Sequence, residues 1–392
     1  MVNPAIPEFE KYLRTPEPLQ RERAEAWRIA IGLQAVDGLT VSDFLKHTAQ
    51  QHIEGLIDID EAGRRIKTYY QTKTNRETDD DDKQEADTVS RNITKLLGEQ
   101  SFTFSVAGLA AIHRQIFSGV FKHAGKFRQY DITKKEWVLD GDTVLYSRWQ
   151  DLRMTLAYDL EQEKQFDYSA LSVAEMVEHL AGFVSGLWQI HPFREGNTRT
   201  TAIFTIKYLR SIGFQHVNND LFEQHSWYFR NALVRANYRN LKKAINPDNR
   251  FLVAFFRNLL LNENNPLHNR IMHISWQEPT EEQLPSTPTS TPTSTPTSTG
   301  QVQDKSQIIS SETIDRVVRA LGRSEMPIKD LMLAVGLKDR KNFIEYSLNP
   351  AIRQGFVQML YPDSPHHPRQ KYLLTVKGQL LYNELITHSA DQ

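Results

Sequence analysis

The chain has 392 residues, which at roughly 100–200 residues per domain is enough for two or three folded units. Its 47 basic and 48 acidic side chains leave a net charge of −1, so composition gives no global electrostatic reason to bind nucleic acid. The absence of cysteine excludes disulfide scaffolds, thiol catalysis and cysteine-liganded metal sites, and it is compatible with a reducing cytosol.

The N-terminal segment Met1–Leu19 mixes prolines and charges and lacks the continuous apolar stretch of a signal peptide. No segment reaches the run of about 18 apolar residues that a membrane span requires. We therefore expect a cytoplasmic protein that makes no membrane contact.

The N-terminal part predicts helices. Ala24–Gly38 has apolar residues at three-to-four spacing and ends in Asp-Gly, and Val41–Glu54 starts beside Ser42, a residue type favoured at helix N-caps. The acidic run Thr78–Asp82 is interpreted as a solvated helix entry, because bare charge runs are usually surface; an acidic metal site is the alternative.

The segment Tyr130–Tyr146 departs from this helical pattern. Two β-prone stretches flank Asp140-Gly141, a dipeptide that favours a tight turn because glycine accepts positive φ. We predict a β-hairpin here. A lone hairpin is marginally stable, so it must either pack on the helices or present an edge to another chain.

The most informative segment is Trp188–Arg199, a loop between two apolar-periodic helices, Leu171–Leu187 and Thr200–Leu209. Gly196 and Asn197 allow a turn in which successive backbone N–H groups point outward. The uncapped amides at the N-terminus of the second helix add to this group of donors. Such a nest, with the positive end of the helix dipole, suits a polyphosphate.

Three side chains of this loop add chemistry. Arg199 offers a planar fork of donors to phosphate, Glu195 offers an oxygen ligand suited to Mg²⁺, and His191 can accept a proton at neutral pH. Each residue alone also has an ordinary interpretation as surface or core. Their combination within nine positions favours a site.

Pro285–Gly300, with three Thr-Pro-Thr-Ser repeats, predicts an extended, solvated linker, with a modified stalk as the alternative. Beyond it, three helices and two strands in that order predict a winged helix: residues 308–321, 328–335, 338–347, 356–361 and 371–375.

The sequence His191-Pro-Phe-Arg-Glu-Gly-Asn-Thr-Arg199 resembles the Fic motif, H-P-F-x-D/E-G-N-G-R-x-x-R. The resemblance extends over roughly Ala24–Asn269. Ala124–Arg128 is similar to the segment that leads into the Fic flap, and the predicted hairpin, about Ile132–Tyr146, stands where Fic proteins carry that flap.

The resemblance implies transfer of AMP from ATP to a Tyr, Thr or Ser hydroxyl of a target protein, with release of pyrophosphate. It implies that His191 is the base, that Glu195 holds Mg²⁺, and that Phe193 anchors the loop. The remaining implied contacts are a phosphate nest (Gly196, Asn197, Thr198, Arg199), an adenosine-contacting helix (Phe229, Asn237) and a flap edge that holds the target (Trp137, Val138, Leu139). Phe229 and Asn237 fit a helix core equally well.

Two residues depart from the motif. Thr198 replaces a glycine, which leaves the nest usable because threonine fits a first helical turn. Ala202 replaces the second arginine, which contacts the γ-phosphate in the family, so the preferred nucleotide stays open.

Gln50–Gly55 resembles the inhibitory helix of many Fic proteins, S/T-x-x-x-E-G/N, with Gln50 in place of Ser or Thr. The resemblance implies that Glu54 reaches the nucleotide site and competes with phosphate. The alternative is a solvated glutamate that closes an ordinary helix.

These predictions add up to a mainly α protein: a Fic-type helical domain with a β-hairpin flap, plus a small α+β winged-helix domain. We predict an N-terminal helical region at 1–100, a catalytic core at 101–277, a linker at 278–306 and a winged helix at 307–392. The alternative function is a catalytically weak Fic-fold protein that binds DNA through Arg340, Lys341, Arg369 and Lys371, or docks proteins. A second copy of the chain stays open as a partner.

Overall fold

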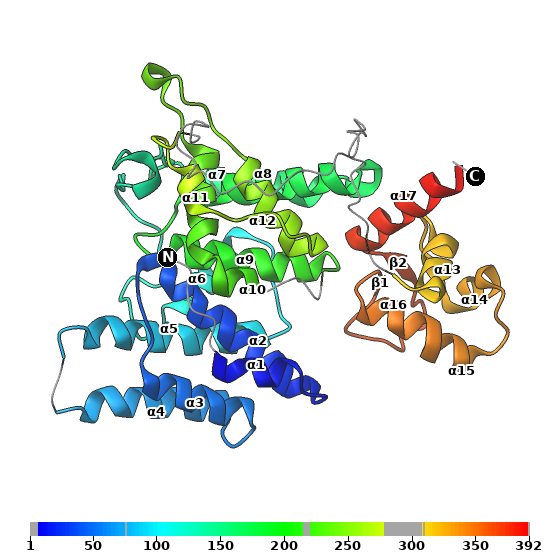
Figure 1. Cartoon of the computed structure of the whole chain (residues 1–392). Helices are drawn as coiled ribbons and strands as arrows, with labels where there is room; N and C mark the ends of the chain where they lie inside the picture. Colours follow the sequence, from blue (N-terminus) through cyan, green and yellow to red (C-terminus); the bar gives the residue numbers. More distant parts are fainter. Residues whose placement is uncertain (1–6, 75–76, 215–219, 278–307, 309, 391–392) are drawn as a thin grey trace, which may run out of the picture.

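The computed structural model describes residues 7–74, 77–214, 220–277, 308 and 310–390, and it is predominantly helical (Figure 1). The segment predicted as a linker, 278–306, lies outside the described residues. An extended helical body precedes this segment, and a smaller unit with its own apolar core follows it.

The N-terminal region is built from five helices and one short 3₁₀ turn. Ser42 caps α3 as predicted, because its hydroxyl accepts a hydrogen bond from the Leu45 amide at 3.0 Å. The acidic run begins α5, where Asp79 and Asp80 pair with Lys83 and Lys73. The elements are α1 (Pro7–Leu13), α2 (Pro18–Gly32), η1 (Leu33–Asp37), α3 (Asp43–Ile53), α4 (Ile59–Thr72) and α5 (Asp80–Gly98).

The central helices surround α9, which is buried along nearly its whole length. The preceding helix, α8, starts at a capping box formed by Ser172 and Glu175. The elements are α6 (Val106–Ile116), η2 (Trp137–Leu139), α7 (Leu152–Gln165), η3 (Tyr168–Ala170), α8 (Val173–Ile190), α9 (Asn197–Ser211), α10 (Asp220–Gln224), α11 (Ser226–Asn237), η4 (Leu241–Lys243), α12 (Arg250–Leu261) and η5 (Asn269–Met272).

The flap segment differs from the predicted hairpin, since the described residues 130–147 contain no strand. Two backbone bonds close a loop around the 3₁₀ turn η2: the Glu136 amide donates to the Asp142 carbonyl at 2.9 Å, and the Gly141 amide donates to the Glu136 carbonyl at 3.0 Å. Asp140 takes the left-handed conformation at φ 54°, so the predicted turn is present. The apolar residues Val138 and Leu139 are buried, and this packing replaces a regular ladder.

The C-terminal unit contains the predicted helices and a two-stranded antiparallel sheet in which Val357 pairs with Leu374 and Met359 with Tyr372. The strands are shorter than expected, the third helix continues through a π turn, and a further helix follows the sheet. The elements are α13 (Glu312–Leu321), α14 (Ile328–Val335), α15 (Arg340–Phe343), η7 (Ile344–Leu348), α16 (Asn349–Arg353), β1 (Val357–Met359), β2 (Tyr372–Leu374) and α17 (Val376–Ala390).

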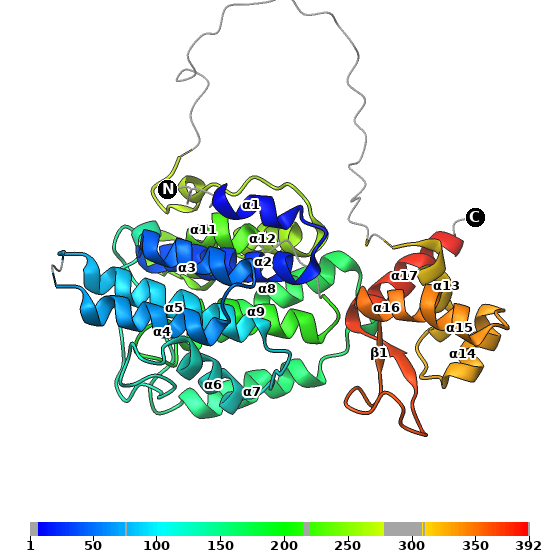
Figure 2. The ribbon, with the colours of Figure 1, turned by 90° about the horizontal axis from the view of Figure 1, so that it is seen from below.

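The C-terminal unit lies against one end of the helical body in both views (Figures 1 and 2). Gly213 and Gly355 meet there so closely that a Cβ on Gly355 would come within 1.8 Å of the Gly213 carbonyl oxygen. Asn383 of α17 also donates to the Ser169 carbonyl at 2.8 Å. This junction is at the C-terminal end of α9, whereas the motif loop leads into its N-terminal end.

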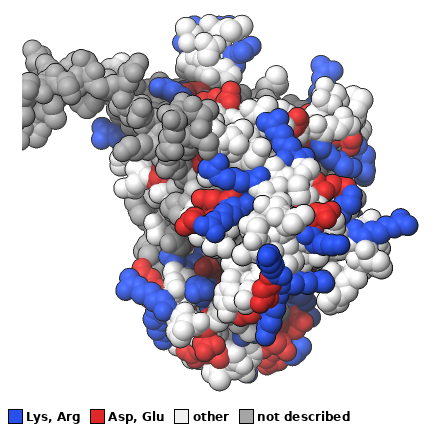
Figure 3. Space-filling view, turned by 90° about the vertical axis from the view of Figure 1, so that its right-hand side faces the viewer, with Lys and Arg blue, Asp and Glu red and all other residues white. Residues whose placement is uncertain are grey.

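Lys and Arg are interspersed with Asp and Glu on the face that the C-terminal unit presents (Figure 3). A mixed surface of this kind does not concentrate the positive charge that phosphate neutralisation needs. Every helix in the described part of the chain is too short or too polar to cross a membrane.

Candidate active site

The motif loop joins the C-terminus of α8 to the N-terminus of α9 through two left-handed residues. His191 ends α8 at φ 51°, and Gly196 stands before α9 at φ 71°. Gly196 has no side chain to cap the helix, so the first amides of α9 keep no partner within the helix. A 15-residue helix thus points an uncapped N-terminus at the loop, an arrangement that favours anions.

The loop is held rigid by its own side chains. The Asn197 carboxamide accepts from the Phe193 amide at 2.9 Å and donates to the Phe193 carbonyl at 2.8 Å. Phe193 is buried and stacks on His113, whose Nε2 lies 3.0 Å from the Glu195 carbonyl oxygen. Asn197, predicted to bind nucleotide, therefore acts through its side chain as a brace that shapes the turn.

Arg128 clamps the same loop from the segment that leads into the flap. Its guanidinium donates to the backbone carbonyl of His191 at 2.8 Å and to that of Tyr130 at 2.8 Å, and its amide donates to the Pro192 carbonyl at 2.9 Å. Neither this clamp nor the His113 contact could be found from the motif itself, because both join residues more than 60 positions apart.

His191 is arranged as a base. Its side chain is buried, and Nδ1 lies 3.3 Å from the Trp188 carbonyl oxygen, which fixes the proton on Nδ1. Nε2 then carries a lone pair and is buried without a hydrogen-bond partner in the described part of the chain. Burial first, then the charge of Lys134, holds the pKa of His191 well below 6.5, so the imidazole is neutral at pH 7.

The space next to His191 is small. It is enclosed by the loop, η1, the flap and α11, and its volume of about 10 Å³ admits only about one water molecule. The lining residues are Asp37, Lys134, Glu136, Trp188, His191, Gly196, Asn197, Thr198 and Arg230. A nucleotide is far larger than this space as it stands.

Arg199 is buried and already has three partners from the N-terminal region. Its Nη1 donates to Gln34 Oε1 and its Nη2 to Glu85 Oε1, each at 2.9 Å. Its Nε lies 2.9 Å from Asp37 Oδ2, an ion pair that lacks hydrogen-bond geometry. Asp37, at the end of η1, is therefore a carboxylate that both pairs with Arg199 and lines the space beside the nest.

Glu54 does not reach this site. Its carboxylate accepts hydrogen bonds from Tyr12 and from Gln50, and it follows α3 as that helix's C-cap. The structure thus gives Glu54 the role of closing a helix against α1. Asp37-Gly38 has the same order of acid and glycine as Glu54-Gly55, and that order was the signal in the sequence that could have identified Asp37.

The other predicted contacts are distributed between the site and the core. Thr198 lines the space and accepts from the Trp188 indole at 2.9 Å. Phe229 is fully buried and packs on Phe222 and Phe255. Asn237 donates to Ser185, which fastens α11 to α8. Neither Phe229 nor Asn237 lines the space beside His191.

The predicted flap edge is largely covered. Val138 and Leu139 are buried, and the Val138 carbonyl accepts from the Ile274 amide at 3.0 Å. Trp137 alone of the three is exposed, with half of its surface free, and its ring contacts His273. A chain added at Val138 would have to displace the segment around Ile274.

Two cations that the sequence reasoning missed line the space. Arg230 of α11 donates to Glu136 Oε2 of the flap and to the Val36 carbonyl of η1, each at 2.9 Å. Lys134 of the flap enters the same space. Ile132, Lys134 and Glu136 face inward in alternation with exposed neighbours, a pattern of the structure that the mostly charged sequence of this segment does not show.

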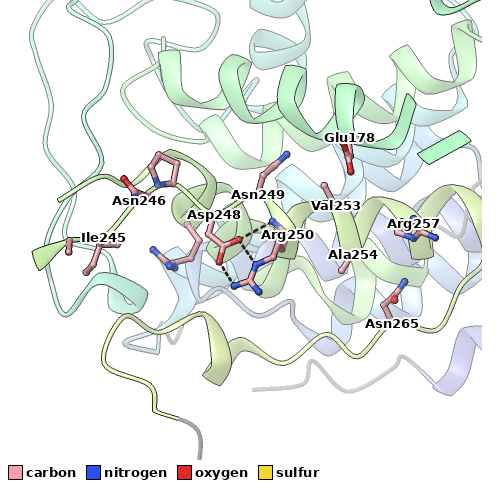
Figure 4. Close-up of a pocket in the computed structure, with 13 residues that line it drawn as sticks. Glu178, Ile245, Asn246, Asp248, Asn249, Arg250, Val253, Ala254, Arg257 and Asn265 are labelled. Carbon is pink, nitrogen blue, oxygen red and sulfur yellow. Dashed lines mark hydrogen bonds and ion pairs between the residues drawn. The ribbon is translucent and has the colours of Figure 1, made fainter. Parts of the chain in front are cut away.

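A larger cavity of about 840 Å³ lies elsewhere, between α8, α12 and the loop after α11 (Figure 4). Asp248 binds Arg250 through both carboxylate oxygens, and Arg257 binds Glu263 in the same way. This cavity contains no histidine and no part of the motif, so size alone does not identify the site.

Comparison with known proteins agrees with the motif. The sequence profile of the Fic/DOC family matches residues 103–209. The chain contains a Fic/DOC domain. A second profile, for the C-terminal domain of Fic-like proteins ("filamentation induced by cAMP protein Fic-like"), matches residues 312–375, which span α13 to the end of the sheet. The Fic/DOC domain holds α6 to α9 and so includes the loop and the uncapped helix N-terminus.

Two relatives are protein adenylyltransferases by name. The protein adenylyltransferase VbhT of Bartonella schoenbuchensis is 28% identical over 130 residues, which are 33% of this chain and 26% of VbhT. The probable protein adenylyltransferase Fic of Escherichia coli K12 is 31% identical over 109 residues, 27% of this chain and 50% of that protein. The similarity spans half or less of either relative.

Among solved structures, a Fic family protein from Desulfovibrio desulfuricans aligns over 95% of this chain and 94% of its own, with 16% identity and a TM-score of 0.40. The BepC protein of Bartonella tribocorum, determined with bound AMPPNP, aligns over 47% of this chain and 87% of its own, with 19% identity and a TM-score of 0.37.

Proposed function

We propose that this protein transfers AMP from ATP to a hydroxyl side chain of a target protein. The observation that carries the proposal is the buried Nε2 of His191, which has no partner among the described residues and lies beside the uncapped N-terminus of α9. A lone pair that can take a proton stands next to a site for phosphate, which is what nucleotidyl transfer to a hydroxyl requires. The Fic/DOC domain and the names of the two relatives support the same reaction.

In the proposed reaction, the oxygen of a Tyr, Thr or Ser hydroxyl attacks the α-phosphorus of ATP. The bond from the α-phosphorus to the bridging oxygen breaks, and pyrophosphate leaves with its electron pair. His191 Nε2 takes the hydroxyl proton, while the Trp188 carbonyl keeps Nδ1 protonated. The amides at the start of α9 stabilise the charge on the transferring group, so the chain contributes mainly position and electrostatics.

Glu195 fits the role of a magnesium ligand. Its carboxylate is half exposed, and its contact with Arg194 is long at 3.5 Å, so an oxygen is available. Mg²⁺ in nucleotide sites is commonly held by one or two carboxylates together with the phosphates, and bound there it would neutralise phosphate charge. We expect Glu195→Ala to raise the magnesium concentration needed for half-maximal ATP binding, whereas an unchanged titration would exclude this role.

The test of the proposed function is label transfer. The full chain is incubated with ATP labelled at the α-phosphate, in parallel with ATP labelled at the γ-phosphate, in the presence of Mg²⁺ and a cell lysate. Protein-bound label from the α-position only, together with release of pyrophosphate, supports adenylyl transfer. Label from the γ-position would indicate a phosphoryl transfer instead, and no label from either would contradict the proposal. GTP, CTP and UTP are run alongside because Ala202 leaves the base open.

We also propose that Asp37 holds the enzyme in a closed, inhibited state. Its carboxylate pairs with Arg199 and lines the space next to Gly196 and Thr198. An anion there competes with phosphate for the same cation and the same helix N-terminus. The small volume of the space supports this view, since nucleotide entry requires the Asp37 turn or the flap to move.

Asp37→Asn should raise auto-modification about tenfold, equivalent to about 1.4 kcal/mol, because the amide keeps the size of the side chain but removes its charge. The measurement is the initial rate of label incorporation into the chain itself. Glu54→Gln is the matched control, because Glu54 contacts Tyr12 and Gln50 and should leave the rate unchanged. A rate that falls in Asp37→Asn would mean that Asp37 positions Arg199 for catalysis.

A further inference from the structure

A triphosphate carries several negative charges, but most cations around the nest already have partners within the protein. Arg199 has Gln34, Asp37 and Glu85 as partners. Arg230 is engaged by Glu136 and by a backbone carbonyl. The residue of α9 one turn beyond Arg199 is Ala202, which is fully buried and has no charge.

Lys134 differs from these arginines. It lines the same space as His191 and the start of α9, and among the described residues its ammonium makes no hydrogen bond or ion pair. Burial lowers the pKa of Lys134, and the charge of Arg230 lowers it further. The carboxylates of Asp37, Glu136 and Glu195 act on it only through longer-range attraction. Lys134 is partly buried, and an anion that enters the space would give its ammonium the direct partner that it lacks.

The flap fixes the direction of this side chain. Asp131, Thr133 and Lys135 are exposed, whereas Ile132, Lys134 and Glu136 face inward, so the segment runs as an extended chain with Lys134 in its inner row. The Lys134 amide donates to Thr143 Oγ1 at 3.2 Å, and Glu136 is tied to Arg230 at 2.9 Å. The Lys134 amide and the Glu136 side chain are therefore both held, which keeps the backbone that carries Lys134 beside the site.

We propose that Lys134 binds the triphosphate of the nucleotide and supplies from the flap a cation that α9 lacks at Ala202. The inference rests on the proposed function. It gives the flap a second task besides facing the target: an ammonium that contacts phosphate couples closure of the flap to the presence of the nucleotide. Lys134, a residue outside the motif, would then be responsible for tighter binding of a nucleoside triphosphate than of an uncharged nucleoside.

The experiment compares equilibrium binding of ATP and of adenosine to the full chain and to three variants, Lys134→Ala, Lys134→Arg and Lys135→Ala, by titration calorimetry with Mg²⁺ present. We expect Lys134→Ala to weaken ATP binding at least tenfold and to leave adenosine binding unchanged. Lys134→Arg should recover most of the ATP affinity. Lys135→Ala, which removes an equal charge from the exposed row of the same segment, should bind both as the parent does.

Equal ATP affinity of Lys134→Ala and the parent would overturn the proposal and leave the proposed function standing, provided that label from α-labelled ATP is still transferred. Weakening of ATP and adenosine together would overturn it as well, since this would indicate a distorted flap. If the parent itself neither binds ATP nor transfers label, the proposed function fails and the role of Lys134 fails with it. Thermal unfolding of each variant separates loss of binding from loss of fold.

Discussion

We expect His191→Ala to lower the rate of AMP transfer by roughly 10²–10⁴-fold, the usual contribution of a positioned general base. ATP affinity should be nearly unchanged, because the imidazole acts on the incoming hydroxyl. The initial rate with α-labelled ATP and the affinity from calorimetry, measured on the same preparation, separate the two effects. His366→Ala, a change at an exposed histidine in the loop between β1 and β2, serves as the control and should transfer at the parent's rate.

The pH dependence tests the same role from another direction. Because burial and Lys134 hold the pKa of His191 well below 6.5, its base form is complete at neutral pH. We therefore expect kcat/KM to be flat from about pH 6.5 upward and to fall only as the pH drops through the lowered value. An inflection of kcat/KM near pH 6.5 that disappears in His191→Ala would mean that the imidazole is solvated. Transfer by His191→Ala at the parent's rate would exclude His191 as the base.

Local signals in the sequence carried the prediction of the helices and of the loop. Ser42 and the apolar spacing placed α3, and the motif placed a turn at Gly196 between α8 and α9. These signals act over a few residues, since caps and turns depend on side chains next to the backbone that they bind. The profile match at residues 103–209 confirms the Fic/DOC assignment on the same motif.

Contacts between distant segments could not be predicted in the same way. Arg199 meets Gln34 across 165 positions and Glu85 across 114, and no local pattern selects those partners. Glu54-Gly55 and Asp37-Gly38 look alike in sequence, and only the packing of η1 beside α9 brings Asp37 to Arg199. The flap differs from the predicted β-hairpin for a related reason, since burial of Val138 and Leu139 against distant segments outweighed the β propensity of the local sequence.

Gly196→Ala should combine a loss of stability with a loss of transfer, because two separate constraints meet at this glycine. Its φ of 71° is left-handed, which costs an L-residue about 1–2 kcal/mol. A Cβ would also lie 2.1 Å from Cζ of Phe117, a fully buried ring that itself lies against the Arg199 guanidinium. Overpacking of this kind typically adds about 1–3 kcal/mol.

Gly141→Ala provides the matched control for Gly196→Ala. Gly141 has φ 81°, yet nothing lies within 4 Å of the position that a Cβ would take there, so the substitution meets the backbone cost alone. Thermal or urea unfolding of both variants therefore isolates the contact with Phe117 as the difference between them. We expect Gly196→Ala to be the less stable of the two by about 1–3 kcal/mol. Since the ring cannot yield without moving Arg199, the start of α9 must shift instead, and transfer should fall by more than tenfold even where the variant is fully folded. Equal stability of the two variants would show that Phe117 moves aside freely and that the nest does not depend on it.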